Sequence, residues 1–402
     1  MHRLSKVILA LLMVCLLAGP SLAAPNTDQG TARKIIIFQS GISQQVQNNV
    51  LKKVGAFEVK KLSMVNAAVV MVNQNNEADL LAQPEVLRVE DDALVYTQEA
   101  GKSIPTAFIE TLPWGIDRID CDLVWDQNQD GVVDDNANAG QGIKVALLDT
   151  GINLDHPDLA DNIYGGYNAI DPRKAPMDTY GHGTHVAGII AGIDNEIGVI
   201  GAAPKANLYA VKVLDINSGY VSDVIEGLQW CIDNDMQIVN MSVGLPEDVS
   251  AFHDAIIAAY EQGIVLVAAA GNYGPGENTV SYPAIYPEVI AVGATDSNDQ
   301  IPYWSSQGPQ VAIAAPGQDI YSTFNGVTYK SLMGTSMACP HVTGAAALVL
   351  ANGITDDNGN GRVNDEVRDQ LLSTATDLGT PGWDSVSGWG LVNAARAVGI
   401  QP

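Results

Sequence analysis

From residue 113 onward, short β-rich runs alternate with stretches of helical periodicity, and this alternation limits the fold more than any other feature of the chain. Strands separated by helices build a parallel sheet that is covered by helices on both faces. We therefore predict an α/β domain over residues 113–402 with a doubly wound, mainly parallel sheet, and we expect a functional site at the carboxyl ends of its strands. The expected strands cover 144–148, 207–214, 237–241, 264–269 and 289–292, and the expected helices cover 184–192, 222–234, 249–261 and 337–352.

A smaller unit precedes this domain over residues 31–98. Its periodicity changes in the order β-α-β-β-α-β, which is typical of a small ferredoxin-like α+β sandwich. Residues 99–112 lose this periodicity, so we expect an exposed linker that contains a processing site. The expected strands of the small unit are 34–38, 59–62, 67–72 and 86–95, and its expected helices are 43–54 and 77–81.

Residues 1–23 have the features of a secretory signal peptide. A basic start precedes an apolar core over 7–17, and residues 21–23 fit a small-x-small cleavage site. The apolar core is too short to anchor the chain in a bilayer, and no later stretch is long and apolar enough. We therefore expect a secreted, extracellular protein without a membrane anchor.

The cysteine content beyond the signal peptide is low. Cys121, Cys231 and Cys339 remain, so at most one disulfide can form within the chain. The sequence leaves a Cys121–Cys231 bridge open.

Composition narrows the class of partner. The formal net charge is −26, from 46 acidic and 20 basic residues, and such a polyanion is not suited to nucleic acids or anionic membranes. The hydrophobic content of 47%, against 16% charged residues, is enough for a sizeable core. The charge fits a soluble exported protein or one that binds hard cations, and it does not separate the two.

The octapeptide 334–341 places a serine at the expected start of a helix. Gly334 permits a tight turn, Ser336 occupies the expected N-cap position, and Pro340 lies in the expected first turn, where a missing N–H is tolerated. The Ser336 hydroxyl would then lie beside unpaired N–H groups at the positive end of the helix, where negative charge is stabilised. From these eight residues alone, a helix-capping serine and a nucleophile are both consistent with the pattern.

Two further segments supply an acid and a base. Asp149 follows an apolar strand and precedes a glycine turn, and His182 lies between glycines at a helix start, where another element can approach the ring. A serine nucleophile needs a neighbouring base, and the base needs an orienting carboxylate. Asp149, His182 and Ser336 provide these three residue types. A zinc site at His182 and His185 is disfavoured, because no adjacent glutamate supplies a general base.

All three segments resemble the motifs of the subtilisin-like serine proteases (subtilases). The motifs are Asp149-Thr-Gly, Gly181-His-Gly-Thr-His and Gly334-Thr-Ser-Met-Ala-x-Pro-His, and the resemblance extends from about Trp114 to Ala395. It implies a secreted, monomeric serine endopeptidase that cleaves proteins or peptides through an acyl-enzyme. The alternatives are a non-enzymatic calcium-dependent binding module and a catalytically inactive member of the same fold.

The resemblance also implies an oxyanion site and a substrate groove. Asn272 would donate its side-chain amide to the oxyanion, with the backbone N–H of Ser336 as the second donor. Residues 242–244 would bind peptide as an added strand. Leu245 and Ser281 stand where the family often has glycines, so we expect a smaller or reshaped pocket for the residue before the scissile bond. The expected substrate-binding residues are Ser242, Val243, Gly244, Ala270, Gly271 and Ser281.

Three loops carry oxygen donors suited to structural calcium. Two of them match the first half of an EF-hand loop, although position 12 of the first is Ala137 instead of glutamate. The third, at 193–199, is implied by the family resemblance, with Glu110 as a further candidate ligand. The simpler explanation for each EF-hand-like loop is a solvated acidic turn. The expected ligands are Asp126, Asn128, Asp130 and Asp135 in the first loop, Asp356, Asn358 and Asn360 in the second, and Asp158, Ile193, Asn195, Ile197 and Val199 at the third.

Residues 31–98 resemble the inhibitory propeptide of the family, which assists folding and blocks the cleft with its C-terminal tail. We therefore expect a zymogen that cuts itself between Gln98 and Glu110, with its own propeptide as intramolecular chaperone and inhibitor.

Overall fold

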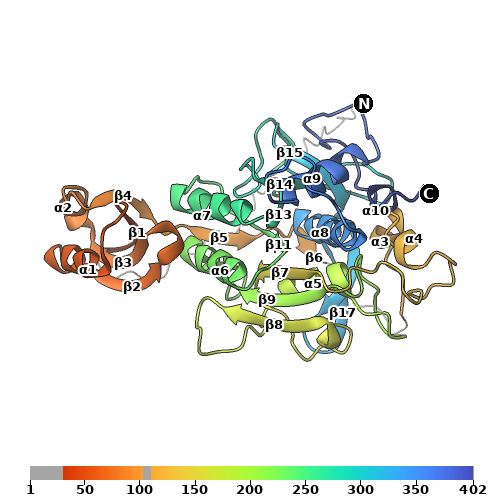
Figure 1. Cartoon of the computed structure of the whole chain (residues 1–402), viewed down its shortest axis with the longest axis horizontal. Helices are drawn as coiled ribbons and strands as arrows, with labels where there is room; N and C mark the ends of the chain where they lie inside the picture. Colours follow the sequence, from red (N-terminus) through yellow and green to blue (C-terminus); the bar gives the residue numbers. More distant parts are fainter. Residues whose placement is uncertain (1–29, 103–109, 402) are drawn as a thin grey trace, which may run out of the picture.

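The computed structural model describes residues 30–102 and 110–401 (Figure 1). The predicted signal peptide and the middle of the predicted linker lie outside these described residues. Within them, no helix combines the length and the apolarity that a membrane span requires.

The N-terminal unit, residues 31–98, has the predicted β-α-β-β-α-β order of elements. Its four strands form an antiparallel sheet in the order β2-β3-β1-β4. In β1, Ile36 and Phe38 pack into the unit's own core, whereas Ile35 and Ile37 belong to a core shared with the large domain. The elements are β1 (Thr31–Phe38), α1 (Gln44–Lys53), β2 (Phe57–Leu62), η1 (Ser63–Val65), β3 (Ala67–Asn73), η2 (Gln74–Asn76), α2 (Glu77–Leu81) and β4 (Val86–Asp91).

The last predicted strand of this unit, 86–95, is in fact two strands. β4 ends at Asp91, and the chain then leaves the first sheet as β5 (Leu94–Thr97). β5 lies as the central strand between β10 (Ser218–Tyr220) and β12 (Val243–Gly244), and it is antiparallel to both. The C-terminal tail of the small unit is therefore part of a sheet of the large domain. The next short strand, β6 (Gly101–Lys102), pairs with β17.

The large domain is built on a seven-stranded sheet in the order β15-β14-β13-β11-β7-β9-β8, and all its strand pairs are parallel. The predicted α/β fold class is confirmed. Its strands are β7 (Lys144–Asp149), β8 (Ile163–Asn168), β9 (Asn207–Lys212), β11 (Ile238–Met241), β13 (Val265–Ala269), β14 (Val289–Thr295) and β15 (Val311–Pro316), and β16 (Ile320–Phe324) and β17 (Thr328–Met333) form a separate hairpin. Its helices are α3 (Trp114–Arg118), α4 (Asp122–Trp125), η3 (Ala160–Asn162), α5 (His182–Ala191), α6 (Val221–Asp233), α7 (Ser250–Glu261), α8 (Thr335–Asn352), α9 (Asn364–Ser373) and α10 (Ala394–Ala397).

Successive residues of the central strand β7 face two different cores. Val145 and Leu147 pack into the cluster that contains α5 and α8, whereas Ala146 and Leu148 pack into the cluster that contains α6 and α7. This burial on both faces explains why the strand is apolar at every position. The three described cysteines, which are Cys121, Cys231 and Cys339, are buried and free, so the disulfide that the sequence left open does not form.

Candidate active site

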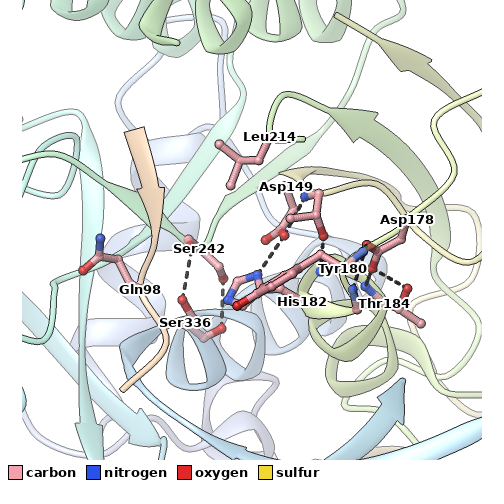
Figure 2. Close-up of polar contacts among 12 residues, drawn as sticks. Gln98, Asp149, Asp178, Tyr180, His182, Thr184, Leu214, Ser242 and Ser336 are labelled. Carbon is pink, nitrogen blue, oxygen red and sulfur yellow. Dashed lines mark hydrogen bonds and ion pairs between the residues drawn. The ribbon is translucent and has the colours of Figure 1, made fainter. Parts of the chain in front are cut away.

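Asp149 is the last residue of β7, at the carboxyl edge of the sheet. Its side chain is fully buried, and Oδ1 accepts hydrogen bonds from the backbone N–H of Thr150 and from Nδ1 of His182, both at 2.7 Å. Because a carboxylate accepts and does not donate, the proton of the second bond lies on Nδ1 of the imidazole. Asp149 thus orients the ring of His182 and leaves Nε2 as the basic nitrogen (Figure 2).

His182 is the first residue of α5, and a buried carboxylate that the sequence analysis missed fixes this helix start. Asp178 accepts hydrogen bonds from the backbone N–H groups of Tyr180 and Gly181, both at 2.8 Å, through Oδ1. Its Oδ2 accepts from the N–H and hydroxyl of Thr184, at 2.9 and 2.6 Å. An acidic residue just before a helix start is a recognisable sequence signal for such capping. Asp178 therefore positions His182 without contacting the Ser336 side chain.

The electrostatic environment of His182 favours its protonated form. Burial opposes the charge and by itself would lower the pKa of His182. The charge and hydrogen bond of Asp149 outweigh this effect, and the nearby Glu99 and Asp178 act in the same direction, so the pKa lies above its ordinary value. The site can therefore stabilise an imidazolium ion once a proton has been taken up.

Ser336 lies two residues further inside its helix than predicted. α8 begins at Thr335 and its N-cap is Gly334, whose φ of +149° favours glycine. Ser336 is consequently not the N-cap, and Pro340 falls in the second turn of the helix, not the first. Ser336 is fully buried. Its backbone N–H donates a hydrogen bond to the carbonyl oxygen of Gln98 at 3.1 Å instead of to a residue of its own helix.

The hydroxyl of Ser336 does not bond to His182 in this structure. Its Oγ donates to the carbonyl oxygen of Ser242 at 3.0 Å, and Nε2 of His182 has no hydrogen-bond partner among the described residues. In the view of Figure 2 the imidazole lies between the side chains of Asp149 and Ser336. The hydroxyl must therefore turn away from Ser242 before His182 can take its proton.

Asn272 follows β13, beside the start of α8. Its Oδ1 accepts hydrogen bonds from the N–H and hydroxyl of Thr335, at 3.0 and 3.1 Å, and the same hydroxyl accepts from the N–H of Gly271 at 3.0 Å. Thr335 thus holds the acceptor end of the Asn272 amide, while the NH₂ group makes no hydrogen bond to a described residue. A fixed amide with a free N–H is what an oxyanion donor requires.

The chain's own tail occupies the cleft beside these residues. β5 pairs Thr97 with Val243 and Tyr96 with Gly244, and the N–H of Gln98 donates to the carbonyl of Ser242 at 3.2 Å. Figure 2 shows β5, in pale orange, leading Gln98 to the region of Ser242 and Ser336. The predicted groove of residues 242–244 therefore does bind an extended strand, and that strand belongs to the N-terminal unit.

Gly244, one of the predicted pocket residues, lies against both the hydroxyl of Ser281 and the side chain of Gln98. A Cβ built on Gly244 would lie 2.7 Å from Oγ of Ser281 and 2.9 Å from Nε2 of Gln98. Ser281 is in turn bonded to the carbonyl of Ala270, through its N–H at 2.8 Å and its hydroxyl at 3.2 Å. The side chains of Val243 and Leu245, by contrast, are buried in the core cluster of α6 and α7.

Comparison with known proteins identifies the family. The model of the subtilase family matches residues 140–390, which is more than half of the chain. The chain belongs to the subtilase family. This subtilase is 38% identical to subtilisin E of Bacillus subtilis over 401 residues, with 98% of this chain and 97% of that relative covered. It is 37% identical to an alkaline protease of Shouchella clausii, with 98% of each chain covered. It is 44% identical to subtilisin Savinase of Lederbergia lenta over 289 residues, which are 72% of this chain and 99% of that relative.

These relationships confirm the predicted class of enzyme, a subtilisin-like serine endopeptidase. They do not support the alternative of a non-enzymatic calcium-dependent binding module.

His185, the second histidine of the motif, donates from Nε2 to the carbonyls of Ile320 and Lys330, at 3.0 and 2.9 Å. Burial lowers its pKa to about 3. This ring is therefore neutral and holds two backbone carbonyls together inside the domain.

The two EF-hand-like loops of the subtilase have the same hydrogen-bond pattern. In the first, Oδ1 and Oδ2 of Asp126 accept from the N–H groups of Asp130 and Gly131, at 3.0 and 2.8 Å. In the second, Oδ1 and Oδ2 of Asp356 accept from Asn360 and Gly361, at 3.1 and 2.7 Å. Both loops are thus wound as the motif predicts, and their first carboxylates are engaged by the loop's own amides. Of the remaining predicted ligands, Asn128, Asp130, Asn358 and Asn360 each accept from an N–H of their own loop.

The third candidate metal site surrounds a buried carboxylate. Asp158 is fully buried, its Oδ2 accepts from the N–H of Val199 at 3.0 Å, and its carboxylate also interacts with the hydroxyl of Tyr329. Burial raises the pKa of Asp158 to about 8, and the charge of Glu110 acts in the same direction. Glu110 itself accepts from the N–H of Asn195 at 2.8 Å. Among the described residues, no group of three or more His, Cys, Asp or Glu side chains has converged into a ready metal site.

Proposed function

We propose that this subtilase is a secreted endopeptidase that hydrolyses peptide bonds in proteins through Asp149, His182 and Ser336, and that it is made as a self-processing zymogen. One observation carries the proposal. The Gln98 carbonyl of the chain's own tail accepts the backbone N–H of Ser336 at 3.1 Å, where a substrate carbonyl would bind. The imidazole of His182 is at the same time held by Asp149 at 2.7 Å. The basic, apolar and small-residue pattern of residues 1–23 supports export.

The proposed mechanism follows from these contacts. Ser336 Oγ turns from the Ser242 carbonyl to Nε2 of His182, gives it the proton and attacks the substrate carbonyl carbon. Asp149 keeps Nδ1 protonated and stabilises the imidazolium. The negative oxygen of the tetrahedral intermediate is stabilised by the N–H of Ser336 and the side-chain amide of Asn272. His182 then protonates the leaving amine, and a water molecule repeats the sequence on the acyl-enzyme.

Contacts between the N-terminal unit and the large domain support its role as propeptide. Asp92 accepts from the N–H of Ser222 at 2.9 Å, and Glu90 accepts from the N–H of Ala251 at 3.0 Å. Ser222 and Ala251 are the second residues of α6 and α7, so each helix has an acidic side chain of the small unit at its positive end. Such paired capping would help the two helices to form and would hold the tail of the small unit over the cleft.

Structural calcium is part of the proposal at the site around Asp158. Asp158 is a fully buried carboxylate whose raised pKa reflects the cost of charging it there, and the oxygen donors around it fit a hard divalent ion. Calcium there would supply stability and not chemistry. The residues that would hold it are Asp158, Ile193, Asn195, Ile197 and Val199, with Glu110 as a further ligand, and the two EF-hand-like loops are weaker candidates.

A serine-directed fluorophosphonate probe tests the proposed function. We expect labelling at Ser336 in the processed, calcium-loaded protein and none in Ser336→Ala. The same variant should accumulate as the uncut precursor. Absence of labelling in the wild type would contradict the proposed enzyme, and wild-type-like shortening of purified Ser336→Ala would contradict self-processing.

A further inference from the structure

Three backbone hydrogen bonds determine which peptide bond lies at the nucleophile. On one side, the N–H of Gln98 donates to Ser242 at 3.2 Å, and its carbonyl accepts from Ser336 at 3.1 Å. On the other side, the N–H of Ala100 donates to the carbonyl of Met333 at 2.8 Å. These contacts hold the chain before and after the peptide bond that follows Gln98. That bond is therefore the one whose carbonyl carbon the Ser336 hydroxyl can reach.

The side chain of Gln98 is buried, and its amide lies near the uncharged groups of Tyr96, Gly244 and Ser281. It is 3% exposed, and its Nε2 donates to the carbonyl of Tyr96 at 3.3 Å. Nε2 of Gln98 and Oγ of Ser281 both lie within 3 Å of the position that a Cβ on Gly244 would take, at 2.9 and 2.7 Å. The Ser281 hydroxyl donates to Ala270, so its lone pairs are left for a donor such as an amide NH₂. The pocket thus offers room and polarity for an amide, and the groups named here offer no counter-charge for an ion.

We propose that Gln98–Glu99 is the first bond that this protease cuts, and that its pocket selects glutamine before the scissile bond, with Ser281 as the residue that determines the selection. The inference rests on the proposed function and adds a substrate class to it. A charged side chain would lose its hydration in this pocket without a partner. An aromatic ring would leave the lone pairs of the Ser281 hydroxyl without a donor.

Cleavage of the Gln98–Glu99 bond needs only the residues named above and one water molecule. A bond forms between Oγ of Ser336 and the carbonyl carbon of Gln98, and the C–N bond to Glu99 breaks. The serine proton passes through His182 to the new amine of Glu99. Water then releases Gln98 as a carboxylate and restores the serine. The products are a propeptide that ends at Gln98 and an enzyme that begins at Glu99.

Mass spectrometry of the first products tests the bond. The full-length precursor is sampled at early times, with Ser336→Ala as the control that cannot cut itself. We expect a released fragment that ends at Gln98 in the wild type and no such fragment in the control. A Ser336-dependent fragment with another end overturns the assigned bond while the proposed function stands. If the wild type shows neither a fragment nor probe labelling, both proposals fail.

Peptide substrates test the selection by the processed enzyme. The peptides have the sequence of residues 95–100, with glutamine, glutamate, lysine or phenylalanine at the fourth position. We expect kcat/KM to be about tenfold higher for glutamine than for each of the other three. In Ser281→Gly, the ratio of the phenylalanine to the glutamine peptide should rise by about tenfold. Because both rates come from one preparation, partial misfolding of the variant cancels from this ratio. A wild-type preference for phenylalanine, or an unchanged ratio in the variant, overturns the selection.

Discussion

Ser242 and Ser336 exchange two hydrogen bonds. The Ser242 hydroxyl donates to the carbonyl of Ser336 at 2.9 Å, and the Ser336 hydroxyl donates to the carbonyl of Ser242 at 3.0 Å (Figure 2). The first of these hydrogen bonds is explained by Pro340, four residues after Ser336. In a regular helix the Ser336 carbonyl would accept from the N–H of residue 340, but Pro340 has none. Ser242 supplies the missing donor and thereby ties the groove strand to the proposed nucleophile.

This relationship predicts a coupling between Ser242 and Pro340. Ser242→Ala leaves a buried carbonyl unsatisfied, so the free energy of unfolding should fall by about 1–3 kcal/mol. In a Pro340→Ala background the helix regains an N–H donor for that carbonyl. Ser242→Ala should then lower the free energy of unfolding by clearly less than it does in the wild type. Thermal unfolding of the four variants measures the coupling, with Ser336→Ala included in each to prevent self-digestion. Equal losses in both backgrounds would show that Ser242 does not replace the helix donor.

Asn272→Ala should lower kcat by roughly 100- to 1000-fold, which is the range known for loss of this donor in a subtilisin. Because the proposed hydrogen bond forms only in the tetrahedral intermediate, KM should change little. Steady-state kinetics on one peptide substrate checks both values. Asn298→Ala, in an exposed turn, is a matched control. An increase in KM with unchanged kcat would place Asn272 in substrate binding instead.

The carboxylate of Glu99 should slow the first self-cleavage at low pH. It helps to raise the pKa of His182, and a protonated imidazole cannot take the serine proton. The rate therefore falls as the pH drops through that raised pKa. In Glu99→Gln the pKa of His182 should be lower, so the acid limb of the pH–rate profile of self-cleavage should move to lower pH. Rates of precursor loss across a pH series measure the shift.

Peptide cleavage by the processed enzyme provides the control for this prediction. After the cut, Glu99 is the N-terminal residue of the enzyme and is no longer held beside His182 by the bond to Gln98, so wild type and Glu99→Gln should share one pH profile on an added substrate. A shift in both assays would mean that the substitution acts on the fold and not on the imidazole.

Removal of calcium should destabilise the processed enzyme through Asp158. A cation present at a hundred times its dissociation constant contributes roughly 2.7 kcal/mol. We expect EGTA to lower Tm in the wild type and to have much less effect in Asp158→Asn. Asp155→Asn removes the same charge from an exposed position nearby and should respond to EGTA like the wild type. Equal calcium responses in all three proteins would place the stabilising cation elsewhere.

Much of the fold follows from the sequence because its main signal is local. Alternating apolar runs and helical periods predicted the parallel sheet, but β8 and β15 were missed. Gly165 and Gly166 interrupt β8, and β15 contains several alanines, which have a low β propensity. The division of the predicted strand 86–95 into β4 and β5 was also missed, although the family resemblance implied that the tail would lie in the cleft. The partners of β5, which are β10 and β12, lie more than a hundred residues further along the chain, and no local pattern reports such a pairing.

At the candidate site, the motifs predicted residue types better than they predicted roles. The Asp149–His182 contact was anticipated, whereas the capping role of Asp178 was not, because an acidic residue before a helix is common. The N-cap position of Ser336 was predicted wrongly. Thr335 enters the helix because its N–H and hydroxyl are bonded to Asn272, which lies 63 residues earlier in the chain. Hydrophobic periodicity reports only on nearby residues, so it cannot predict a contact between residues this far apart in the chain.

The contacts of Lys60 bear on what would follow the proposed cut after Gln98. Its ammonium bonds to Asp223 and Glu226 of α6, both at 2.5 Å, and these bonds do not depend on an intact chain at Gln98. Together with the β5 pairing, they would keep the severed fragment in place as a tight-binding competitor of incoming substrate. Under the proposed function, scission and activation would then be separate events, and the onset of proteolysis would depend on how fast the detached fragment dissociates or is digested.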